Sequence, residues 1–321
     1  MPIRFALPRL TASRNGMTAT RDRWAGLLRD TGHDVAPADD AAPVQPGDTA
    51  VVLNGYKSRD TIHALRAAHG DRITLVVCMT GTDLYRDLPA NPDHYATLDL
   101  ADALILLHPG AERALPERFH GKATVIVQSA TVEQHDIAQD PDHFDLCVLG
   151  HLRDVKDPMR AAEASRLLPA SSRVRVVHAG KALTPEYDTR AKREAIENPR
   201  YRWLGEQDRA GVEQTLLRSR GMVLSSLLEG GANVIGESIV AGRPVLSSRT
   251  ACAVGLLGED YPGLFDIGDT RALATLMRRL ETDDALRNDL TQRCESRRAL
   301  FDPAAERAAL RSFFDALPTA V

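Results

Sequence analysis

The sequence predicts an α/β protein with two domains, each built on a doubly wound parallel sheet. The chain has 321 residues, which suits two domains of roughly 150 residues better than a single core. Short apolar runs alternate with segments of helical periodicity along most of the chain. These runs are apolar throughout, as parallel strands buried on both faces are, and their alternation with helices is typical of βαβ units.

Five apolar runs predict the strands of the first domain. They are IRFAL (3–7), AVVLN (50–54), ITLVVCM (73–79), ALILLH (103–108) and TVIVQS (124–129). Amphipathic segments at 20–31 and 58–69 predict helices between the strands. A polar, unpatterned segment follows Ser129 and predicts a domain boundary. We therefore expect an N-terminal domain at 1–136 and a C-terminal domain at 137–321.

The alternation restarts in the second domain. Strands are predicted at 146–151, 174–180, 201–205, 222–226 and 244–248. Helices are predicted at 158–168, 185–197, 208–219, 232–242, 269–281, 283–299 and 303–316. We expect the last helix to pack back on the N-terminal domain. Sheets of this kind bind ligands beyond the carboxyl ends of their strands, so we also expect a ligand cleft between the two domains.

Charge and cysteine content exclude several classes of function. The formal net charge of −4 implies no polyanion-binding surface. No apolar run reaches the ~20 residues of a membrane span, and the N-terminus is typical of a first strand rather than a signal peptide. The four cysteines lie far apart in the sequence, so neither a metal site nor a disulfide framework is expected. We predict a reduced, cytoplasmic protein that needs no metal and no cofactor.

The stretch SLLEGGANVIGESIVAGRPVLSS at 226–248 carries the clearest chemical pattern. A predicted strand precedes its paired glycines and a predicted helix follows them, so the amides at the helix start are unpaired and attract an anion. Those amides belong to Gly230, Gly231, Ala232 and Asn233. Glu229 and Glu237 would repel a bound phosphate by on the order of kcal/mol in a desolvated cleft. As hydrogen-bond acceptors they suit the vicinal hydroxyls of two sugars, which predicts a nucleotide sugar.

This stretch resembles the donor-site motif of the family-four glycosyltransferases, which have the GT-B fold with two Rossmann-like domains. The family pattern is Glu, seven residues, Glu, and then a helix that ends in Gly-x-Pro-Val. The resemblance implies that Glu229 contacts the donor sugar and Glu237 the ribose, while the intervening amides contact the diphosphate. The alternative for the same residues is a structural role without a ligand, as a helix start with two solvated glutamates.

The segment LGHLRDVKDPMRA at 149–161 is similar to a second family motif, Gly-Arg-Leu followed by Lys. Gly150 and Lys156 match, which implies that Lys156 binds the diphosphate. His151 stands where the family has Arg, and Arg153 is expected to supply the guanidinium instead because its fork suits phosphate oxygens. Cations and helix amides would then stabilise the leaving diphosphate without a metal. A surface loop with self-compensating charges is the alternative.

The first domain is expected to hold the acceptor. In VVCMTGTDLYRDL (76–88), Thr80 stands where many relatives have the His of His-Gly-Thr-Asp. A threonine can donate a hydrogen bond but is no general base at neutral pH, which favours an acceptor that is already ionised. The other residues expected around the acceptor are Asn15, Gly16, Lys57, Asp83 and Arg86. Turn chemistry and helix capping are the alternative roles for such loop residues.

Five strings together resemble one subgroup of the family, the selenosugar synthases of selenoneine biosynthesis. They are MTGTDLYRDL, GHLRDVKDP, RYRWLG, LLEGGANVIGE and VGLLGEDYPGLF. The resemblance implies transfer of a hexose, N-acetylglucosamine or glucose, from a UDP-sugar to selenophosphate, with uracil recognised near Gly205. The alternatives are a conventional UDP-sugar-dependent O- or S-glycosyltransferase and a non-catalytic nucleotide-sugar binding protein. The donor preference, the anomeric outcome and the oligomeric state do not follow from the sequence.

Overall fold

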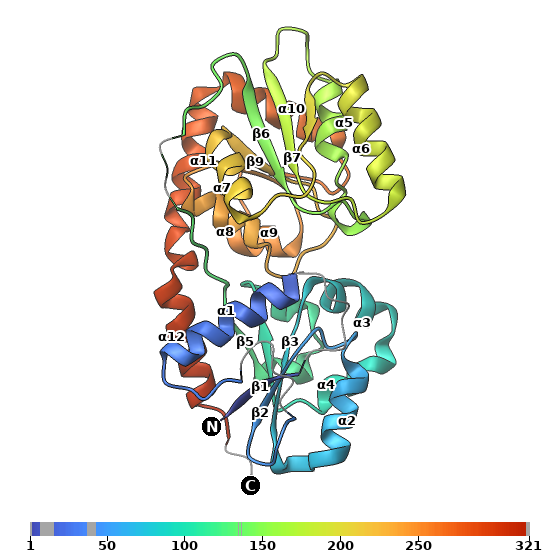
Figure 1. Cartoon of the computed structure of the whole chain (residues 1–321), viewed down its shortest axis with the longest axis vertical. Helices are drawn as coiled ribbons and strands as arrows, with labels where there is room; N and C mark the ends of the chain where they lie inside the picture. Colours follow the sequence, from blue (N-terminus) through green and yellow to red (C-terminus); the bar gives the residue numbers. More distant parts are fainter. Residues whose placement is uncertain (1, 7–15, 37–42, 134, 136, 319–321) are drawn as a thin grey trace. The chain divides into compact units, whose positions relative to one another are not determined.

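The chain forms two compact units. A computed structural model describes residues 2–6, 16–36, 43–133, 135 and 137–318 (Figure 1). Unit 1 comprises Met1–Gln128 and Pro303–Val321, and unit 2 comprises Ser129–Asp302. The division between the units therefore falls before Ser129, earlier in the chain than the expected boundary after residue 136.

Unit 1 contains a parallel sheet of five strands in the order β1-β2-β3-β4-β5. The strands are β1 (Ile3–Phe5), β2 (Thr49–Leu53), β3 (Thr74–Cys78), β4 (Ala103–Leu106) and β5 (Ala123–Val125). Val35 forms a single parallel bridge with Ile3, whose other neighbour is Thr49 of β2. The chain thus moves to one side of β1 and then returns past it, which is the reversal of a doubly wound sheet.

Both faces of this sheet are buried, because alternate residues of each strand enter two different cores. Val51 of β2 packs with Trp24, while its neighbour Val52 packs with Ile62. The helices of unit 1 are α1 (Gly16–Asp30), α2 (Arg59–His69), α3 (Leu88–Ala90), α4 (Tyr95–Asp99) and α12 (Pro303–Asp315). Its other turns are the π-helical turn η2 (Asp83–Asp87) and the 3₁₀ turns η1 (Gly70–Arg72), η3 (Pro92–His94), η4 (Ala111–Ala114) and η5 (Glu117–Lys122).

Helix α12 comes from the far end of the sequence and lies beside α1 in unit 1 (Figure 1). Leu310 and Phe313 of α12 share a core with Trp24 and Leu28 of α1. Trp24 Nε1 also donates to the Oε1 atom of the buried Glu306 at 2.7 Å. Apolar contact and a buried hydrogen bond to a carboxylate together fix this helix on the sheet face that α1 covers.

Unit 2 contains a parallel sheet of six strands in the order β11-β10-β9-β6-β7-β8. The strands are β6 (Phe144–Leu149), β7 (Val174–Ala179), β8 (Tyr201–Trp203), β9 (Gly221–Leu224), β10 (Val245–Ser248) and β11 (Leu264–Phe265). From β6 the chain proceeds to β7 and β8 on one side, and then to β9, β10 and β11 on the other. The topological switch point therefore lies between β6 and β9, where sheets of this kind bind ligands.

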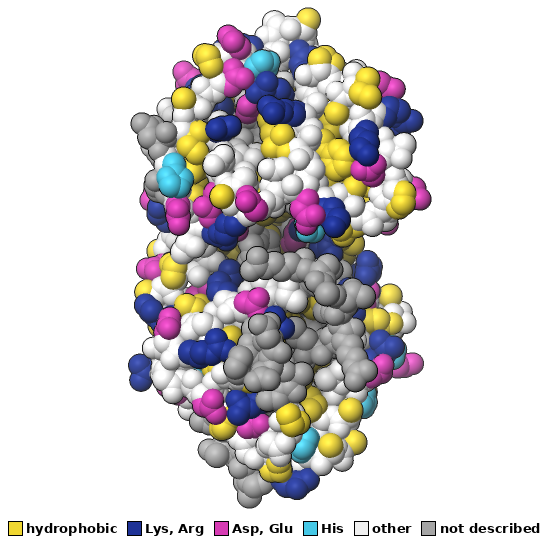
Figure 2. All heavy atoms as spheres, viewed as in Figure 1, with side chains coloured by type: hydrophobic (Ala, Val, Ile, Leu, Met, Phe, Trp, Pro, Cys, Tyr) yellow, Lys and Arg dark blue, Asp and Glu magenta, His cyan; other side chains and the backbone are white. Residues whose placement is uncertain are grey.

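Of the seven helices described in unit 2, the first five connect its strands, and the last two follow β11. The helices are α5 (Arg160–Arg166), α6 (Pro185–Glu197), α7 (Arg209–Arg218), α8 (Asn233–Val240), α9 (Ala251–Leu257), α10 (Thr270–Thr282) and α11 (Asp284–Ser296). The 3₁₀ turns are η6 (Asp154–Lys156) and η7 (Arg298–Phe301). On the face shown in Figure 2, Lys and Arg side chains lie among Asp and Glu side chains, in keeping with the small net charge.

The predicted α/β class with two doubly wound parallel sheets is confirmed. Short elements were not predicted, among them α3 with three residues, α4 with five, α9 with seven and β11 with two. Helix α9 begins after Thr250, whose Oγ1 accepts a hydrogen bond from Ala253 N at 3.2 Å. A search of the helices in the described part of the chain finds none that is long and apolar enough to cross a membrane. The expected cleft between the domains stays a prediction.

Candidate functional site

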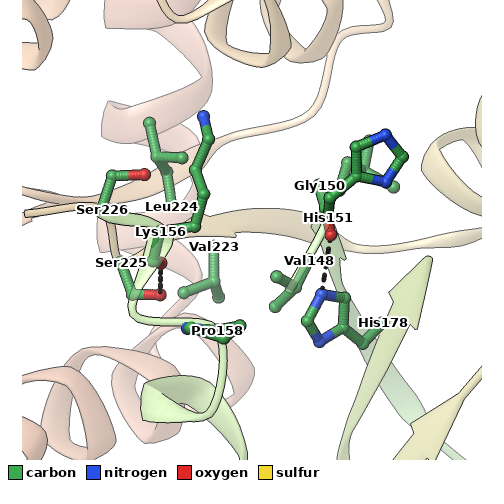
Figure 3. Close-up of a pocket in the computed structure, with 11 residues that line it drawn as sticks. Val148, Gly150, His151, Lys156, Pro158, His178, Val223, Leu224, Ser225 and Ser226 are labelled. Carbon is green, nitrogen blue, oxygen red and sulfur yellow. Dashed lines mark hydrogen bonds between the residues drawn. The ribbon is translucent and has the colours of Figure 1, made fainter. Parts of the chain in front are cut away.

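A small pocket lies at the topological switch point of unit 2, beyond the carboxyl ends of β6 and β9 (Figure 3). Residues 148–151 line it from the end of β6, and residues 223–226 line it from the end of β9. Lys156 and Pro158 enter from the loop before α5, and His178 enters from β7. The pocket thus occupies the position at which doubly wound sheets bind ligands.

An ion pair joins the loop after β6 to the loop after β9. Lys156 Nζ lies 2.5 Å from Glu229 Oε1, and Ser226 Oγ donates to the same oxygen at 2.5 Å. The Glu229 side chain is 9% exposed and that of Lys156 is 21% exposed, so each charge depends on its partner. The other carboxylate oxygen of Glu229, Oε2, has no hydrogen-bond partner among the described residues. The structure therefore brings together the two residues that the sequence assigned to sugar and to diphosphate.

The backbone around Lys156 is fixed separately from its ammonium group. Ser225 Oγ donates to the carbonyl oxygen of Asp157 at 2.9 Å and lies 3.3 Å from that of Lys156 (Figure 3). Leu227 N donates to the carbonyl oxygen of Val155 at 2.9 Å. Asp157 adopts the left-handed conformation, with φ of +41°, and ends the η6 turn. Three contacts with the loop after β9 thus hold the turn that presents Lys156.

Helix α8 starts after the paired glycines, as the sequence predicted, and Asn233 is its first residue. Ala232 precedes it in the left-handed conformation, with φ of +37°, which is strained for a residue other than glycine. The backbone N–H groups of Gly230, Gly231 and Ala232 have no hydrogen-bond partner in the described part of the chain. Free amides at a helix start, a few residues from Lys156's partner Glu229, are suited to an anion.

Glu237 lies on α8, and its side chain is 23% exposed. Arg209 NH1 lies 3.9 Å from Glu237 Oε1, while Arg209 Nε lies 2.8 Å from Glu213 Oε1. Arg209 is 61% exposed, and an ion pair with this much access to water is weak. Glu237 is not among the residues that line the small pocket.

His151 does not replace the arginine that the family has at this position. Burial lowers the pKa of His151, and its Nδ1 atom accepts a hydrogen bond from Lys181 N at 3.2 Å. Its imidazole is therefore neutral at neutral pH. The Arg153 side chain is exposed, and its guanidinium has no ion-pair or hydrogen-bond partner among the residues described, so this loop can offer it to an anion.

Gly150 is held in place by a neutral histidine, His178. His178 Nε2 lies 3.0 Å from the carbonyl oxygen of Gly150, and Nδ1 lies 3.0 Å from the hydroxyl of Tyr201. A carbonyl only accepts, so Nε2 carries the proton and Nδ1 accepts from the tyrosine. Burial lowers the pKa of His178 to about 4, which keeps the ring neutral.

Two glycine loops pack closely next to this histidine. A Cβ atom added to Gly180 would lie 1.9 Å from the carbonyl oxygen of Gly150, so only glycine permits this approach. Gly205, with φ of +70°, accepts a hydrogen bond from Gly180 N at 2.8 Å, and Trp203 Nε1 donates to the carbonyl of Gly180 at 2.8 Å. Gly205 thus belongs to the loop after β8 and not to the lining of the small pocket.

In unit 1, Thr80 and Asp83 meet at the carboxyl end of β3, but Asp83 faces inward. Its Oδ1 atom accepts from both the N–H and the hydroxyl of Thr80 at 2.8 Å, and its Oδ2 atom accepts from Gly55 N at 2.8 Å. Asp83 is completely buried, and burial raises its pKa from the usual 3.8 to about 6. This carboxylate ties the loops after β2 and β3 together instead of facing a ligand.

Asn54 is a residue of this cluster that sequence reasoning missed. It is 1% exposed and left-handed, with φ of +65°. Its Nδ2 atom donates to the hydroxyls of Thr80 at 2.7 Å and Thr82 at 3.0 Å, and its Oδ1 atom accepts from Lys57 N at 2.8 Å. Since the Thr80 proton already goes to Asp83, Thr80 can accept one further hydrogen bond but not donate one. The expectation of a donor at Thr80 is corrected accordingly.

The remaining acceptor-side residues are dispersed. Lys57 joins the cluster only through its backbone in the described structure, and its side chain is exposed. Arg86 lies on the π-helical turn η2, is 50% exposed, and pairs with Asp87 at 2.8 Å. Gly16 is the first residue of α1, and Asn15 lies outside the described residues. The structure joins only Thr80 and Asp83 of this predicted set by side-chain contacts within its described range.

The cysteines and possible metal ligands complete the inventory of reactive groups. All four cysteines are free and buried. Burial raises the pKa of the Cys252 thiol on α9, and the charges of Glu229 and Lys156 also act on it, so Cys252 lies close to the ion pair. Within the described ranges, no group of three or more His, Cys, Asp or Glu side chains is arranged to hold a metal ion.

These features define a GT-B glycosyltransferase. Residues 129–297, more than half of the chain, match the family model described as Glycosyl transferases group 1, and the protein belongs to that family. A sequence comparison with curated proteins finds no match.

Solved structures share the fold at low sequence identity. Anabaena Alr3699/HepE in complex with UDP aligns with a TM-score of 0.75 and 16% identity, covering 99% of this chain and 100% of that chain. The same protein in complex with UDP-glucose gives 0.74 and 17% over the same shares. The α,α-trehalose-6-phosphate synthase of Burkholderia multivorans gives 0.66 and 16%, covering 96% of this chain and 79% of its own.

Proposed function

We propose that this glycosyltransferase moves a hexose from a UDP-sugar to selenophosphate and forms a 1-seleno sugar for selenoneine biosynthesis. The observation that carries the proposal is the Lys156–Glu229 pair beside the unpaired amides that precede α8. It combines a cation and free N–H donors for a diphosphate with a carboxylate oxygen for sugar hydroxyls. The acceptor rests on the resemblance of the sequence and on Thr80 at the position of a family histidine.

The donor half is supported by complementarity of charge and hydrogen bonding. Lys156 and the amides of Gly230 and Gly231 would bind the diphosphate, with Arg153 as a second cation. Glu229 would accept from the hexose hydroxyls through Oε2, and Glu237 from the ribose hydroxyls. The fold neighbour from Anabaena was solved with UDP and with UDP-glucose, which supports a UDP-sugar donor here.

Lys156 would serve both anions during the reaction. Its ammonium has three N–H donors, so it can keep its bond to Glu229 and still donate to phosphate oxygens. Negative charge grows on the diphosphate as the bond to the sugar breaks, and a fixed cation and amides stabilise that charge most. Arg153, exposed and without a described partner, would add charge at the rim.

The acceptor half follows from what Thr80 cannot do. Selenophosphate is an anion with an intrinsically strong selenium nucleophile, so no side chain needs to remove a proton before attack. The selenium–C1 bond would form while the bond from C1 to the UDP oxygen breaks, which releases UDP. Water would then cleave the phosphorus–selenium bond, giving inorganic phosphate and the 1-seleno sugar. A threonine without a free proton is compatible with this chemistry and unsuited to general-base catalysis.

Product analysis with a panel of acceptors tests the proposal. The purified chain is incubated with UDP-N-acetylglucosamine or UDP-glucose and with selenophosphate, thiophosphate or simple alcohols, while UDP release and product mass are measured. We expect UDP release and the mass of a 1-seleno sugar with selenophosphate. Transfer only to hydroxyl acceptors would instead identify a conventional O-glycosyltransferase. Binding of UDP-sugar without release of UDP under any condition would identify a binding protein.

A further inference from the structure

Two consecutive serines after β9, Ser225 and Ser226, have hydroxyls that act on opposite partners of the ion pair. Ser225 Oγ donates to the backbone of the turn that carries Lys156, 2.9 Å from the carbonyl oxygen of Asp157. Ser226 Oγ donates to the side chain of Glu229 at 2.5 Å. Neighbouring residues of an extended chain point in opposite directions, so one short segment reaches both. Ser225 thus places the lysine, and Ser226 places the carboxylate.

Ser226 is itself fixed from behind by the neighbouring strand. It is completely buried, and its carbonyl oxygen accepts from Ser248 Oγ of β10 at 2.6 Å. Ser248 is completely buried as well. The Ser226 hydroxyl therefore has no access to solvent and serves Glu229 alone among its described partners. A buried hydroxyl directed at a carboxylate in this way is a rigid support.

The geometry around Glu229 separates its two oxygens. Lys156 and Ser226 both donate to Oε1, which fixes the rotation of the carboxylate and leaves Oε2 without a described partner. The Cys252 thiol on α9 lies close to the ion pair, and burial raises its pKa. Lys156 and Ser226 thus fix the orientation of the Glu229 carboxylate.

We propose that Ser226 is a positioning residue that holds Glu229 with Oε2 directed at the donor hexose. Ser226 acts through Glu229 and contacts no substrate. This inference rests on the proposed function, because it takes Glu229 as the hexose contact. It adds a specific claim: loss of the Ser226 hydroxyl impairs recognition of the sugar and not of the nucleotide.

Binding of UDP-N-acetylglucosamine, UDP-glucose and UDP to Ser226→Ala, measured by calorimetry at neutral pH, tests the claim. The matched control is Ser247→Ala, because Ser247 is also buried on β10 but donates to its neighbour's carbonyl, 3.1 Å from Ser248 O. In Ser226→Ala we expect about tenfold weaker binding of the better UDP-sugar at neutral pH. UDP should bind within about twofold of wild type, because Ser226 does not contact the nucleotide.

The outcomes separate this inference from the proposed function. Equal UDP-sugar affinity of Ser226→Ala and Ser247→Ala would overturn the inference, as would equal loss of UDP and UDP-sugar affinity in Ser226→Ala. Wild-type protein that binds neither UDP nor a UDP-sugar would overturn the proposed function itself. If Ser226→Ala does not fold by thermal unfolding, Ser226→Cys keeps the volume with a weaker donor, and a smaller shift in the same direction is expected.

Discussion

Asp83 of unit 1 and Glu229 of unit 2 are carboxylates that follow the carboxyl ends of parallel strands, yet they have opposite environments. Asp83 is completely buried and meets three neutral donors, which occupy both of its oxygens. Glu229 meets a lysine and a serine on one oxygen, and its other oxygen has no partner in the described structure. One carboxylate joins two loops, and the other presents an acceptor.

The difference shows how the partners of a carboxylate reveal its role. Backbone amides and a hydroxyl that surround Asp83 leave it no capacity for a ligand, and burial disfavours its charge. Glu229 instead pairs with a cation at a site that is still partly open. The same residue class at the same place in a doubly wound sheet thus builds a loop in unit 1 and a candidate ligand contact in unit 2.

Glu229→Gln should give the largest effect. The amide keeps the size of the side chain but removes the charge that holds Lys156, and it places a donor where acceptors are needed. We expect turnover, measured as UDP release, to fall by about 10²-fold or more. Glu259→Gln, a change at an exposed glutamate, is the control and should stay near wild type. Wild-type turnover in Glu229→Gln would remove Glu229 from the site.

Lys156→Met should give the next largest effect and a different signature. The change removes the cation but keeps most of the volume, and it leaves the buried Glu229 without its charge partner. We expect about tenfold weaker binding of UDP itself, in addition to about 10²-fold slower turnover. Lys192→Met on α6, where the lysine is exposed beside Asp188, serves as the control. Unchanged UDP affinity in Lys156→Met would contradict its role toward the diphosphate.

Asp83 should affect the pH dependence of the protein's stability and not its catalysis. Its pKa is higher in the folded state, at about 6, than the usual 3.8, so the folded state binds more protons between these values. The free energy of unfolding that Asp83 contributes should therefore fall as pH rises through this window, by up to about 3 kcal/mol. Thermal unfolding of wild type and Asp83→Asn from about pH 4 to about pH 7 measures the difference.

The Asp83→Asn comparison has a clear sign. Wild type should lose stability relative to Asp83→Asn as pH rises through the window, because only the carboxylate titrates. A stability difference that stays constant with pH would contradict the raised pKa. Glu306→Gln, at another buried carboxylate of unit 1, is the control. It tests whether neutralising any buried carboxylate changes the dependence of stability on pH in the same way.

Substitutions of Asn54 should give the smallest effect. Comparing two of them distinguishes the loss of side-chain hydrogen bonds from the strain of the left-handed backbone. Asn54→Ala removes the hydrogen bonds of the side chain, and alanine adopts φ of +65° less readily than asparagine does. Asn54→Gly removes the same hydrogen bonds but adopts this conformation readily. We expect Asn54→Ala to be less stable than Asn54→Gly by about 1 kcal/mol in denaturant unfolding. Equal stability of the two variants would show that the left-handed backbone stores no strain.

Most of the fold was predictable because parallel strands buried on both faces are apolar throughout. The bridge of Val35 to β1 was not predicted, because a single bridged residue leaves no sequence pattern. This bridge nevertheless defines the reversal of strand order in unit 1. The sequence also identified Lys156 and Glu229, but as contacts of different ligand groups. Their ion pair depends on β6 and β9 being neighbours, which only the sheet order reveals.

The acceptor side was harder to predict because side-chain direction decides it. The sequence pattern of an aspartate two residues after Gly81 is the same whether its side chain faces a ligand or the core. In the structure Asp83 begins the π-helical turn η2 and faces inward, where Thr80 and Gly55 satisfy it. Asn54 gave no signal, because an asparagine after a strand is ordinary turn chemistry.

Calorimetric titration of UDP and of UDP-N-acetylglucosamine or UDP-glucose into wild type and Glu229→Gln tests the central claim most directly. Glu229 is proposed to read the hexose, while Lys156 and the amides before α8 hold the diphosphate. Wild type should bind both ligands, and Glu229→Gln should keep UDP within about twofold while losing about tenfold or more for the UDP-sugar. Equal affinity of wild type and Glu229→Gln for the UDP-sugar would contradict the account.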